Sequence, residues 1–219
     1  MLDSALLLTG RLVRDDRLRA DYNLDMVLPQ RDTPRLTYAD YLTWPEGQSG
    51  ELINGIAYVR EPPAPSRLHQ ELVGELYLQV RLALEGQRCR AYVAPFDVRL
   101  PKSDEADDEI DTVVQPDVII VCDRLKLDER GMRGAPDWVA EVLSSGTASH
   151  DQIVKLPVYE RAGVREVWLI HPTNRILSMY RLEGGHYGRA TILELKGQTT
   201  LNAVPSVSID WDRLLAGLA

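Results

Sequence analysis

The amino-acid sequence predicts an α/β fold that contains a parallel strand–helix–strand crossover. Residues 136–144 and 165–172 are short apolar runs with strand-like composition. Residues 147–163 lie between them, and they have the length and composition of a helix that ends at Gly163. A connection of this length joins parallel strands, so the two runs are expected side by side in one sheet.

The size of the chain favours one compact domain with extensions. Its 219 residues are 44% hydrophobic and 26% charged, as in an ordinary globular protein. Residues 1–33 predict an N-terminal arm, and residues 34–219 a single domain. No apolar run approaches the ~20 residues that cross a bilayer, and the first residues make a poor signal peptide. We therefore expect a cytoplasmic protein without a membrane partner.

The N-terminal half predicts a short helix, a hairpin and a long helix. Thr37 can cap a helix over residues 37–44, and Asn54-Gly55 marks a type I′ turn within residues 50–60. Ser66 can cap a helix that continues to about Gly86. The buried stripe of this helix is predicted to follow i+4 spacing, supported by two flanking positions: Leu68, Leu72, Leu76 and Val80, with Val73 and Tyr77.

The remaining segments alternate between strands and polar connections. Residues 90–100 predict a strand, or a bent pair of strands broken at Pro95, and residues 113–123 predict another strand. The segments 102–111 and 122–134 are expected to be loops, the first acidic and solvated. A hairpin is predicted over residues 176–195 around Gly184-Gly185, and a last short helix over residues 211–217 capped by Asp210.

Charge and cysteine content narrow the function. The net charge of -8 argues against a surface that coats nucleic acid broadly. Only four of the 25 basic residues are lysines, so the position of each lysine is informative. Cys89 and Cys122 have neither metal-binding nor redox spacing, and they are interpreted as small buried side chains in a reducing compartment.

Two acids lie on or beside predicted apolar strands. Asp117 precedes the run VIIVC, and Glu141 shares one strand face with Val139 and Leu143. A buried unpaired carboxylate is costly, so such acids are usually paired or bound to a metal. Carboxylates on neighbouring strands suit Mg²⁺ or Mn²⁺, although a strand-end cap or an arginine salt bridge would also explain Asp117 alone.

The segments QPDVIIVCD, GAPDWVAEVLSSGTASHDQIVKLPVYERAGVREVWLIHP and ELINGIAYVREPPAPSRLHQELVGEL resemble the Uma-two family of predicted restriction endonucleases. That family belongs to the PD-(D/E)xK nuclease superfamily, and the resemblance covers roughly residues 36–195. It implies a restriction-endonuclease-like fold, in which helices flank a mixed central sheet and the crossover carries the site. It also implies that Asp117 and Glu141 hold the metal.

The superfamily pattern places a lysine two residues after the second acid, but this sequence has Leu143 there. The resemblance implies instead that the lysine has moved to the following helix, where Lys155 lies. The alternative is a surface lysine paired with Asp151 at i−4. Pro157 would either kink the helix and aim Lys155, or mark a new helix start.

Four further residues are candidates for supporting roles around the metal site. The resemblance suggests Glu51 for the metal site or its surroundings, although a solvent-facing strand acid is an equal alternative. His69 is more often structural on such a helix, and Tyr159 is expected to pack. The outer positions of the candidate site are then Glu51, His69, Asp97 and Gln115.

These features predict a magnesium- or manganese-dependent endonuclease with Asp117, Glu141 and Lys155 as catalytic residues. Nucleic acid is the expected partner, DNA favoured over RNA, and a homodimer would suit cleavage of both strands. Two alternatives stay open. One is an inactive nuclease-fold module that binds or regulates, and the other is a hydrolase of small phosphodiesters.

Overall fold

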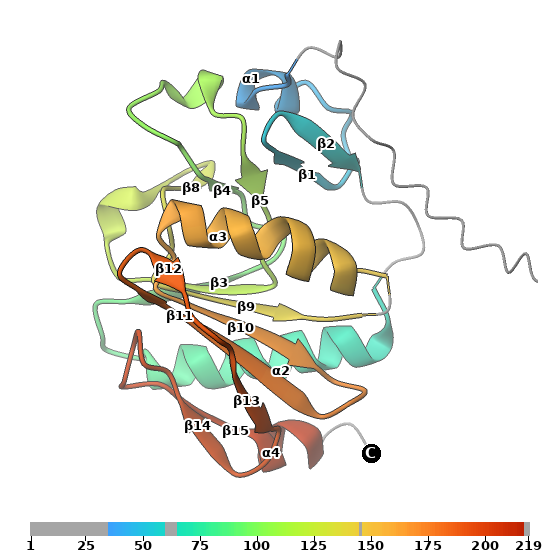
Figure 1. Ribbon diagram of the computed structural model, residues 1–219, viewed down its shortest axis with the longest axis vertical. Helices are drawn as coiled ribbons and strands as arrows, with labels where there is room; N and C mark the ends of the chain where they lie inside the picture. Colours follow the sequence, from blue (N-terminus) through green and yellow to red (C-terminus); the bar gives the residue numbers. More distant parts are fainter. Residues whose placement is uncertain (1–34, 60–64, 145, 217–219) are drawn as a thin grey trace, which may run out of the picture. The chain divides into compact units, whose positions relative to one another are not determined.

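The computed structural model describes residues 35–59, 65–144 and 146–216, and these are built around a seven-stranded sheet (Figure 1). The arm predicted for residues 1–33 lies outside the described residues, so it and the domain boundary stay predictions. The strand order is β12–β11–β10–β9–β6–β3, with β13 also paired to β11. The strands are β3 (Arg90–Val93), β6 (Val118–Val121), β9 (Trp138–Val142), β10 (Glu166–His171), β11 (Ile176–Glu183), β12 (His186–Tyr187) and β13 (Thr191–Glu194).

The predicted crossover is confirmed. Strands β9 and β10 are parallel, with Glu141 paired in register to Leu169. The connection runs through one wide π-type segment, His150–Lys155, into helix α3 (Leu156–Ala162). Gly163 ends α3 at φ 87°, a left-handed conformation that glycine adopts without steric cost. The remaining pairs of this sheet are antiparallel, so the sheet is mixed.

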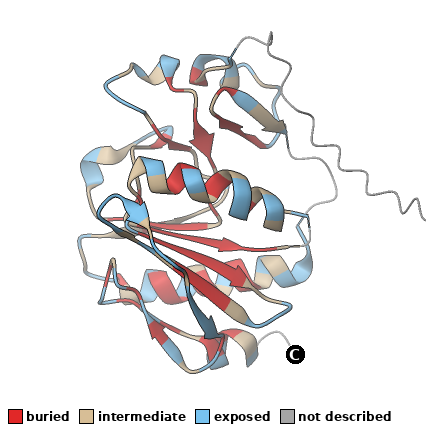
Figure 2. Ribbon diagram, in the orientation of Figure 1, coloured by how far each residue is buried: buried red, intermediate tan, exposed pale blue. Residues whose placement is uncertain are grey.

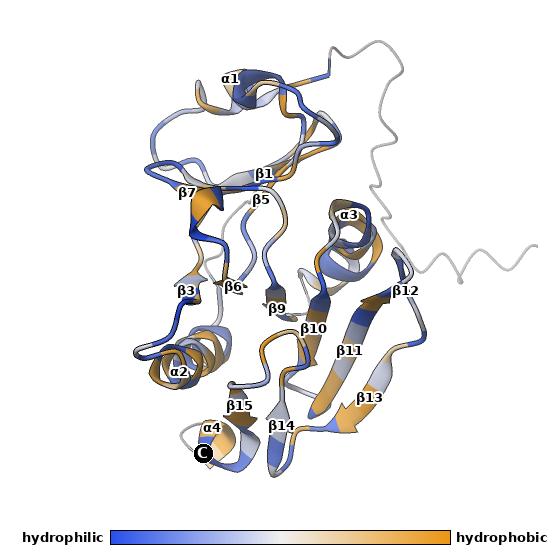
Figure 3. Ribbon diagram, turned by 90° about the vertical axis from the view of Figure 1, so that its left-hand side faces the viewer, coloured by the Kyte–Doolittle hydropathy of each residue, from blue (hydrophilic) through white to orange (hydrophobic). Residues whose placement is uncertain are grey.

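Strand β9 is buried on both faces because each face carries its own core. Ala140 and Val142 pack with helix α2 (Arg67–Ala83), helix α4 (Trp211–Ala216) and strands β14 (Gln198–Thr200) and β15 (Ser208–Asp210). Val139 and Leu143 pack instead with α3. Figure 3 shows α3 on one side of the sheet and α2 with α4 on the other, and Figure 2 shows the buried strands between them. The predicted alternation of β9 is therefore confirmed.

A second, six-stranded sheet has the order β2–β1–β5–β4–β8–β7. The predicted hairpin is confirmed, because β1 and β2 are antiparallel and both turn residues have positive φ, 53° at Asn54 and 77° at Gly55. Next to it lies helix α1 (Tyr38–Tyr41), with Thr37 at its N-cap as predicted. The strands are β1 (Gly50–Ile53), β2 (Ile56–Val59), β4 (Val98–Arg99), β5 (Val113–Val114), β7 (Leu127–Asp128) and β8 (Gly131–Arg133).

The prediction of one strand over residues 113–123 is wrong. Strand β5 belongs to the six-stranded sheet and β6 to the seven-stranded sheet. The chain changes sheets at Gln115, Pro116 and Asp117, because proline has no N–H with which to continue a ladder. This crossing places Asp117 at the start of β6, between the two sheets.

The two predicted loops also differ from expectation. Residues 122–134 contain a short 3-10 turn and the β7–β8 hairpin. Gly131 starts β8 at φ 121°, and a Cβ there would lie 2.2 Å from the Asp97 carbonyl oxygen, so glycine is required. In the acidic segment 102–111, Asp107 is not simply solvated, because it forms an ion pair with the fully buried Arg99.

The long helix α2 begins as predicted, with the Ser66 side chain accepting the His69 N–H. Leu72, Leu76 and Val80 are buried, but Leu68 is 38% exposed, so its place in the predicted stripe is wrong. An i+4 series turns about 40° per step around a 3.6-residue helix, so a stripe of four such positions leaves the buried face at one end.

The cysteine prediction is wrong. Cys89 and Cys122 are half-buried and form a disulfide. Antiparallel pairing of Arg90 with Val121 places them opposite each other, with Cα atoms 3.9 Å apart. A register of this kind cannot be derived from a spacing of 33 residues, and the cysteines no longer support a reducing compartment. Among the described residues, no helix is long and apolar enough to cross a membrane.

Candidate active site

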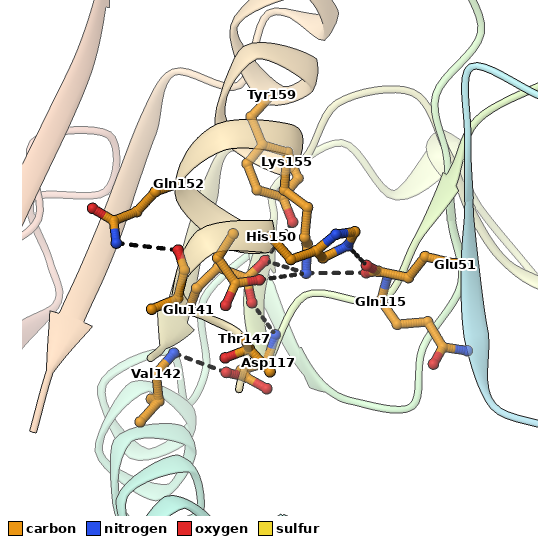
Figure 4. A network of polar contacts seen from close by, with 12 residues as sticks. Glu51, Gln115, Asp117, Glu141, Val142, Thr147, His150, Gln152, Lys155 and Tyr159 are labelled. Atoms are coloured by element: carbon orange, nitrogen blue, oxygen red, sulfur yellow. Dashed lines mark hydrogen bonds and ion pairs between the residues drawn. The ribbon is translucent and has the colours of Figure 1, made fainter. Parts of the chain in front are cut away.

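Asp117 and Glu141 lie opposite each other on neighbouring strands (Figure 4). The pairing of Val118 with Ala140 on β6 and β9 puts these acids at the next position of the ladder. The Asp117 N–H donates to Glu141 Oε2 over 3.3 Å, and the Val142 N–H donates to Asp117 Oδ2 over 2.8 Å. The backbone therefore fixes both carboxylates at the edge where β9 ends.

Glu141 is almost completely buried and accepts two strong donors on one oxygen. Lys155 Nζ lies 2.6 Å from Glu141 Oε1, and the Tyr159 hydroxyl donates to the same atom over 2.5 Å. Burial, together with the acids nearby and against the opposing charge of Lys155, raises the pKa of Glu141 to about 8. The charged form of Glu141 is therefore costly even beside the Lys155 ammonium, and a further cation would favour it.

Lys155 reaches the acids from the crossover, at the end of the π-type segment. Its side chain is only 2% exposed, and Nζ also lies 3.0 Å from Glu51 Oε1 and 3.5 Å from Asp151 Oδ1. Burial disfavours the ammonium, but Glu141 and Glu51 outweigh it and hold the pKa of Lys155 well above its usual range. In the alternative interpretation, the surface position of Lys155 is wrong, but the predicted pair with Asp151 at i−4 is present.

Pro157 lies directly after the change from π-type to α-helical geometry. The Leu156 N–H donates five residues back to the Asp151 carbonyl, and α3 begins at Leu156 with Pro157 next in line. A proline in the first turn of a helix loses no bond that the helix could have made. A single wide turn of this kind is frequent at functional sites, and here it carries Lys155.

Glu51 on β1 connects the second sheet to this centre. It accepts the Gln115 N–H over 2.7 Å, and its Oε2 lies 2.8 Å from His150 Nε2. Burial opposes ionisation of Glu51, but the Lys155 charge and the hydrogen bonds from His150 and Gln115 lower its pKa to about 2. Glu51 is thus an ionised, buried acid, and the alternative of a solvent-facing strand residue is wrong.

Asp97 and Gln115 form an outer layer beside Glu51. The Gln115 side-chain amide donates to Asp97 Oδ1 over 2.8 Å, and the Tyr41 hydroxyl donates to the same oxygen over 3.0 Å. The Gln115 backbone N–H donates to Glu51, so Gln115 connects Asp97 to the buried acids of the centre through hydrogen bonds. Burial, followed by the neighbouring Asp97 charge, raises the pKa of Tyr41 above its usual range.

His69 approaches Asp117 from the N-terminal turn of α2. Its Nε2 lies 3.2 Å from Asp117 Oδ2. The contact brings the two faces of the sheet together at the site, because α2 and α3 pack on opposite faces. The structure therefore places all the predicted site residues around one centre: Asp117, Glu141, Lys155, Glu51, His69, Asp97 and Gln115.

Sequence reasoning did not assign Tyr159 or His150 to the site, and it considered Asp151 only as a surface partner of Lys155. Tyr159, expected only to pack, donates to Glu141. Asp151 is buried beside Lys155, and burial raises its pKa against the opposing Lys155 charge. His150 binds Glu51 across 99 residues of chain. The i+4 spacing of Asp151, Lys155 and Tyr159 is the only sequence signal that could have grouped any of them.

The donor set fits a hard divalent cation chemically. Carboxylates outnumber cations here, since Glu51, Asp117, Glu141 and Asp151 surround the single ammonium of Lys155. Oxygen ligands of this kind suit Mg²⁺ or Mn²⁺. Across residues 35–59, 65–144 and 146–216, however, no group of three or more His, Cys, Asp and Glu side chains is arranged as a ready metal site. Lys155 already draws one oxygen each of Glu51 and Glu141.

The mixed sheet, its parallel crossover and the flanking helices define a protein of the restriction-endonuclease-like nuclease fold. A crystal structure from Anabaena variabilis, described as "a putative nuclease belonging to DUF820", has this fold. It matches with a TM-score of 0.63 and 22% identity, over 84% of this chain and 99% of that one. The chain belongs to the Uma2 family, described as "Putative restriction endonuclease", whose sequence model matches residues 38–212. No curated protein matches the chain.

Proposed function

We propose that the protein is a divalent-metal-dependent endonuclease that hydrolyses phosphodiester bonds in DNA. The observation that carries this proposal is the meeting of Asp117, Glu141 and Lys155, with Lys155 Nζ 2.6 Å from Glu141. Two acids and a lysine on a nuclease fold are the groups that this reaction needs. The family description, a restriction endonuclease, supports DNA over RNA as the substrate.

Asp117 and Glu141 would hold Mg²⁺ or Mn²⁺, with Glu51 close by. When bound, the metal would supply Lewis-acid activation of a water and of the scissile phosphate. The chain's own contribution is to orient the acids: the Val142 N–H fixes Asp117, and the Asp117 N–H meets Glu141. Lys155 and Tyr159 occupy Glu141 Oε1, so Oε2 is the oxygen that faces Asp117.

Lys155 would stabilise negative charge on the phosphate as the bond to the leaving oxygen breaks. A buried ammonium interacts more strongly with such charge than one in water, because the local dielectric is low. Glu51 and Glu141 hold this ammonium in place and keep it protonated. Lys155 on the crossover would thereby perform the role of the lysine that the superfamily pattern has at position 143.

The direct test is cleavage of supercoiled plasmid and of labelled single-stranded and duplex DNA and RNA, with Mg²⁺, Mn²⁺ or EDTA. The parent protein should cut DNA only with metal. Asp117→Asn and Glu141→Gln keep size and shape and should lower the rate at least 100-fold. Unchanged cleavage by either variant would disprove the assigned site, and a parent inactive on all substrates would disprove the function.

A second candidate is a nuclease-fold module that binds nucleic acid without cutting it. The ion pairs of Lys155 with Glu51 and Glu141 favour it, because they satisfy these carboxylates in the absence of a metal. Calorimetric titration with Mn²⁺ separates the two candidates: an endonuclease should bind metal in a way that Asp117→Asn removes. A chromogenic phosphodiester, cut while DNA stays intact, would instead indicate a small-substrate hydrolase.

A further inference from the structure

The edge of the seven-stranded sheet that holds the candidate site continues across the neighbouring strands. Strands β9, β10, β11 and β13 are adjacent in this order (Figure 3). Of these, β9, β10 and β13 run in one direction and end at this edge, whereas β11 runs against them and begins there. The residues just before β11 and just after β13 therefore lie at the same edge as Glu141, which is next to the end of β9.

The turn between β10 and β11 carries an arginine in a backbone conformation that favours glycine. Arg175 has φ 52°, and its N–H donates to the Pro172 carbonyl oxygen over 3.2 Å. Among the described residues other than glycine, only Asn54 also has a positive φ, and asparagine tolerates this conformation better than arginine does. The Arg175 side chain is exposed, so packing does not explain why arginine stands here. Backbone strain of this kind is concentrated at functional sites.

Lys196 lies beside this turn, directly after β13. The Leu195 N–H donates to the Arg175 carbonyl oxygen over 2.9 Å, which holds the end of β13 next to the start of β11. Lys196 is exposed, and within the described part of the chain neither its side chain nor that of Arg175 forms an ion pair or a hydrogen bond. The other three lysines of the chain each contact a carboxylate or a carbonyl oxygen: Lys102, Lys126 and Lys155. Arg175 and Lys196 are thus two cations at the edge of the site whose charge the fold itself does not use.

The two cations lie at different distances from the candidate site. Glu141 is level with Ser178 on β11, because both are in register with Leu169. Arg175 is three residues before Ser178 and two strands from β9, so its Cα lies about 14 Å from that of Glu141, at about 4.8 Å per strand and about 3.3 Å per residue. By the same measure, Lys196 lies about 20 Å from Glu141, four residues along β13 and three strands across.

Acidic side chains limit the positive charge of this region. Glu194 on β13 lies opposite Ile176, and Asp212 accepts the Gly197 N–H. Both acids are exposed, so the edge is not a broadly basic surface, in keeping with the net charge of -8. A polyanion would therefore be held here by individual side chains at defined positions and not by a general field.

We propose that Arg175 and Lys196 bind backbone phosphates of the DNA strand whose scissile bond lies at the candidate site. The proposal rests on the proposed function, because it takes DNA as the substrate. Arginine, lysine, threonine and asparagine are common phosphate ligands, and the exposed Thr173 and Asn174 precede Arg175 in the same turn. A strand that crosses the ends of β9, β10, β11 and β13 carries one charge per about 3.4 Å of helix axis, so phosphates a few nucleotides from the scissile bond reach the two cations.

The test is binding of labelled single-stranded and duplex DNA by the full chain over a range of salt concentrations. Ca²⁺ replaces Mg²⁺, and a gel of each sample checks that the strand stays intact. Arg175→Gln and Lys196→Gln should each raise Kd about five- to eightfold at about 0.1 M salt. Each should also reduce the slope of log Kd against log salt concentration by about 0.7 for single strands and about 0.9 for duplex. Arg189→Gln is the matched control and should change neither value, because Arg189 is exposed and precedes β13 at the opposite edge of the sheet.

Arg175→Gly separates a lost contact from a damaged fold. Glycine adopts a φ of 52° without steric cost, so this variant should keep or raise Tm, by about 2 °C. Its Kd for DNA should nevertheless rise as much as that of Arg175→Gln. Weaker binding by a chain that is no less stable cannot be attributed to misfolding.

Binding and cleavage are measured separately, so this proposal and the proposed function can fail separately. A parent that binds DNA through Arg175 and Lys196 but cuts nothing supports the phosphate contacts and disproves the function. A parent that cuts DNA while the Arg175 and Lys196 variants bind as it does overturns the contacts and leaves the function standing. A parent that binds no DNA, or an Arg189→Gln variant that loses as much affinity as the other two, also overturns the contacts.

Discussion

The crossover and the second sheet supply the two halves of the candidate site by different physical means. The crossover strands β9 and β10 are mostly apolar, and Glu141 is the acid of β9 that faces α3. The second sheet has short strands, and its core also contains a buried arginine: Arg99 pairs with Asp107 and Asp128 and lies over the Tyr38 ring. Both halves bury apolar side chains, and they differ in their buried cations: the acids around Lys155 are buried, whereas those around Arg99 are partly exposed.

The two regions should therefore respond differently to substitution. Lys155 and Tyr159 lie four residues apart on the crossover, so their spacing follows from local structure, and the packing of the crossover on β9 brings them to Glu141. Glu51 belongs to the other sheet and reaches Lys155 and His150 only through tertiary folding. Changes in the first group should therefore affect chemistry and stability together, and changes in the second sheet should affect mainly stability.

The largest effect is expected from Lys155→Met. Removal of the ammonium leaves Glu51, Glu141 and Asp151 buried without their cation, which should cost about 3–5 kcal/mol of unfolding free energy. Cleavage by the folded fraction should fall at least 100-fold. Urea unfolding and plasmid cleavage measure both.

Lys102→Met is the control for this variant, because Lys102 is partly exposed and, among the described residues, forms one ion pair, with Asp111. Its change should cost about 0–1 kcal/mol. Equal losses of unfolding free energy in the two variants would show that the buried ion pairs of Lys155 stabilise the fold no more than an exposed pair does.

Arg99→Met should lower stability through the second sheet while it leaves cleavage at the centre largely intact. It removes the cation from the second sheet, but Asp107 keeps its ion pair with Arg133 and Asp128 is partly exposed, so the cost should be about 1–3 kcal/mol. Cleavage per folded molecule should fall less than about tenfold, because Arg99 contacts none of the central acids. Cleavage that is lost as fully as in Lys155→Met would contradict the proposed division. Arg124→Met, on an exposed arginine, controls for loss of charge.

Glu51→Gln should give a stability loss that depends on pH. The folded-state pKa of Glu51 is lowered from 4.5 to about 2, so ionisation favours the folded state. The stabilisation is fully present above pH 4.5 and is lost as pH falls through 2; it amounts to something on the order of 3 kcal/mol at neutral pH. Urea unfolding at pH 7 and near pH 2.5 should show the parent and the variant converging at acid pH. Glu46→Gln, at an exposed position, should show no such convergence.

The smallest effect is expected from Tyr159→Phe. The variant loses one hydrogen bond to Glu141 and keeps Lys155 in place, so stability should fall by about 1–2 kcal/mol. Cleavage should fall by about tenfold, which corresponds to 1.4 kcal/mol. Tyr77→Phe serves as the comparison, since the Tyr77 hydroxyl makes no hydrogen bond to the described residues. An effect of Tyr77→Phe as large as that of Tyr159→Phe would remove the reason to single out Tyr159.

Local patterns were sufficient for the crossover. The alternation in β9, the helix end at Gly163 and the Asn54-Gly55 hairpin are set by contacts among near neighbours, and the structure confirms them. Patterns failed where the partner is distant. The division at Pro116 into two sheets and the disulfide both depend on which strands meet, and spacing along the chain does not encode that.

By itself, the sequence determined that two acids, Asp117 and Glu141, stand on or beside apolar strands. It also determined that position 143, where the superfamily pattern has lysine, is a leucine. Both follow from the two-residue period of a strand, a local property. Only the tertiary structure decided that Lys155 is buried against Glu141 and Glu51. The free energy of that ammonium depends on how many carboxylates surround it, and these come from β1, β9 and the crossover, which meet only in the folded chain.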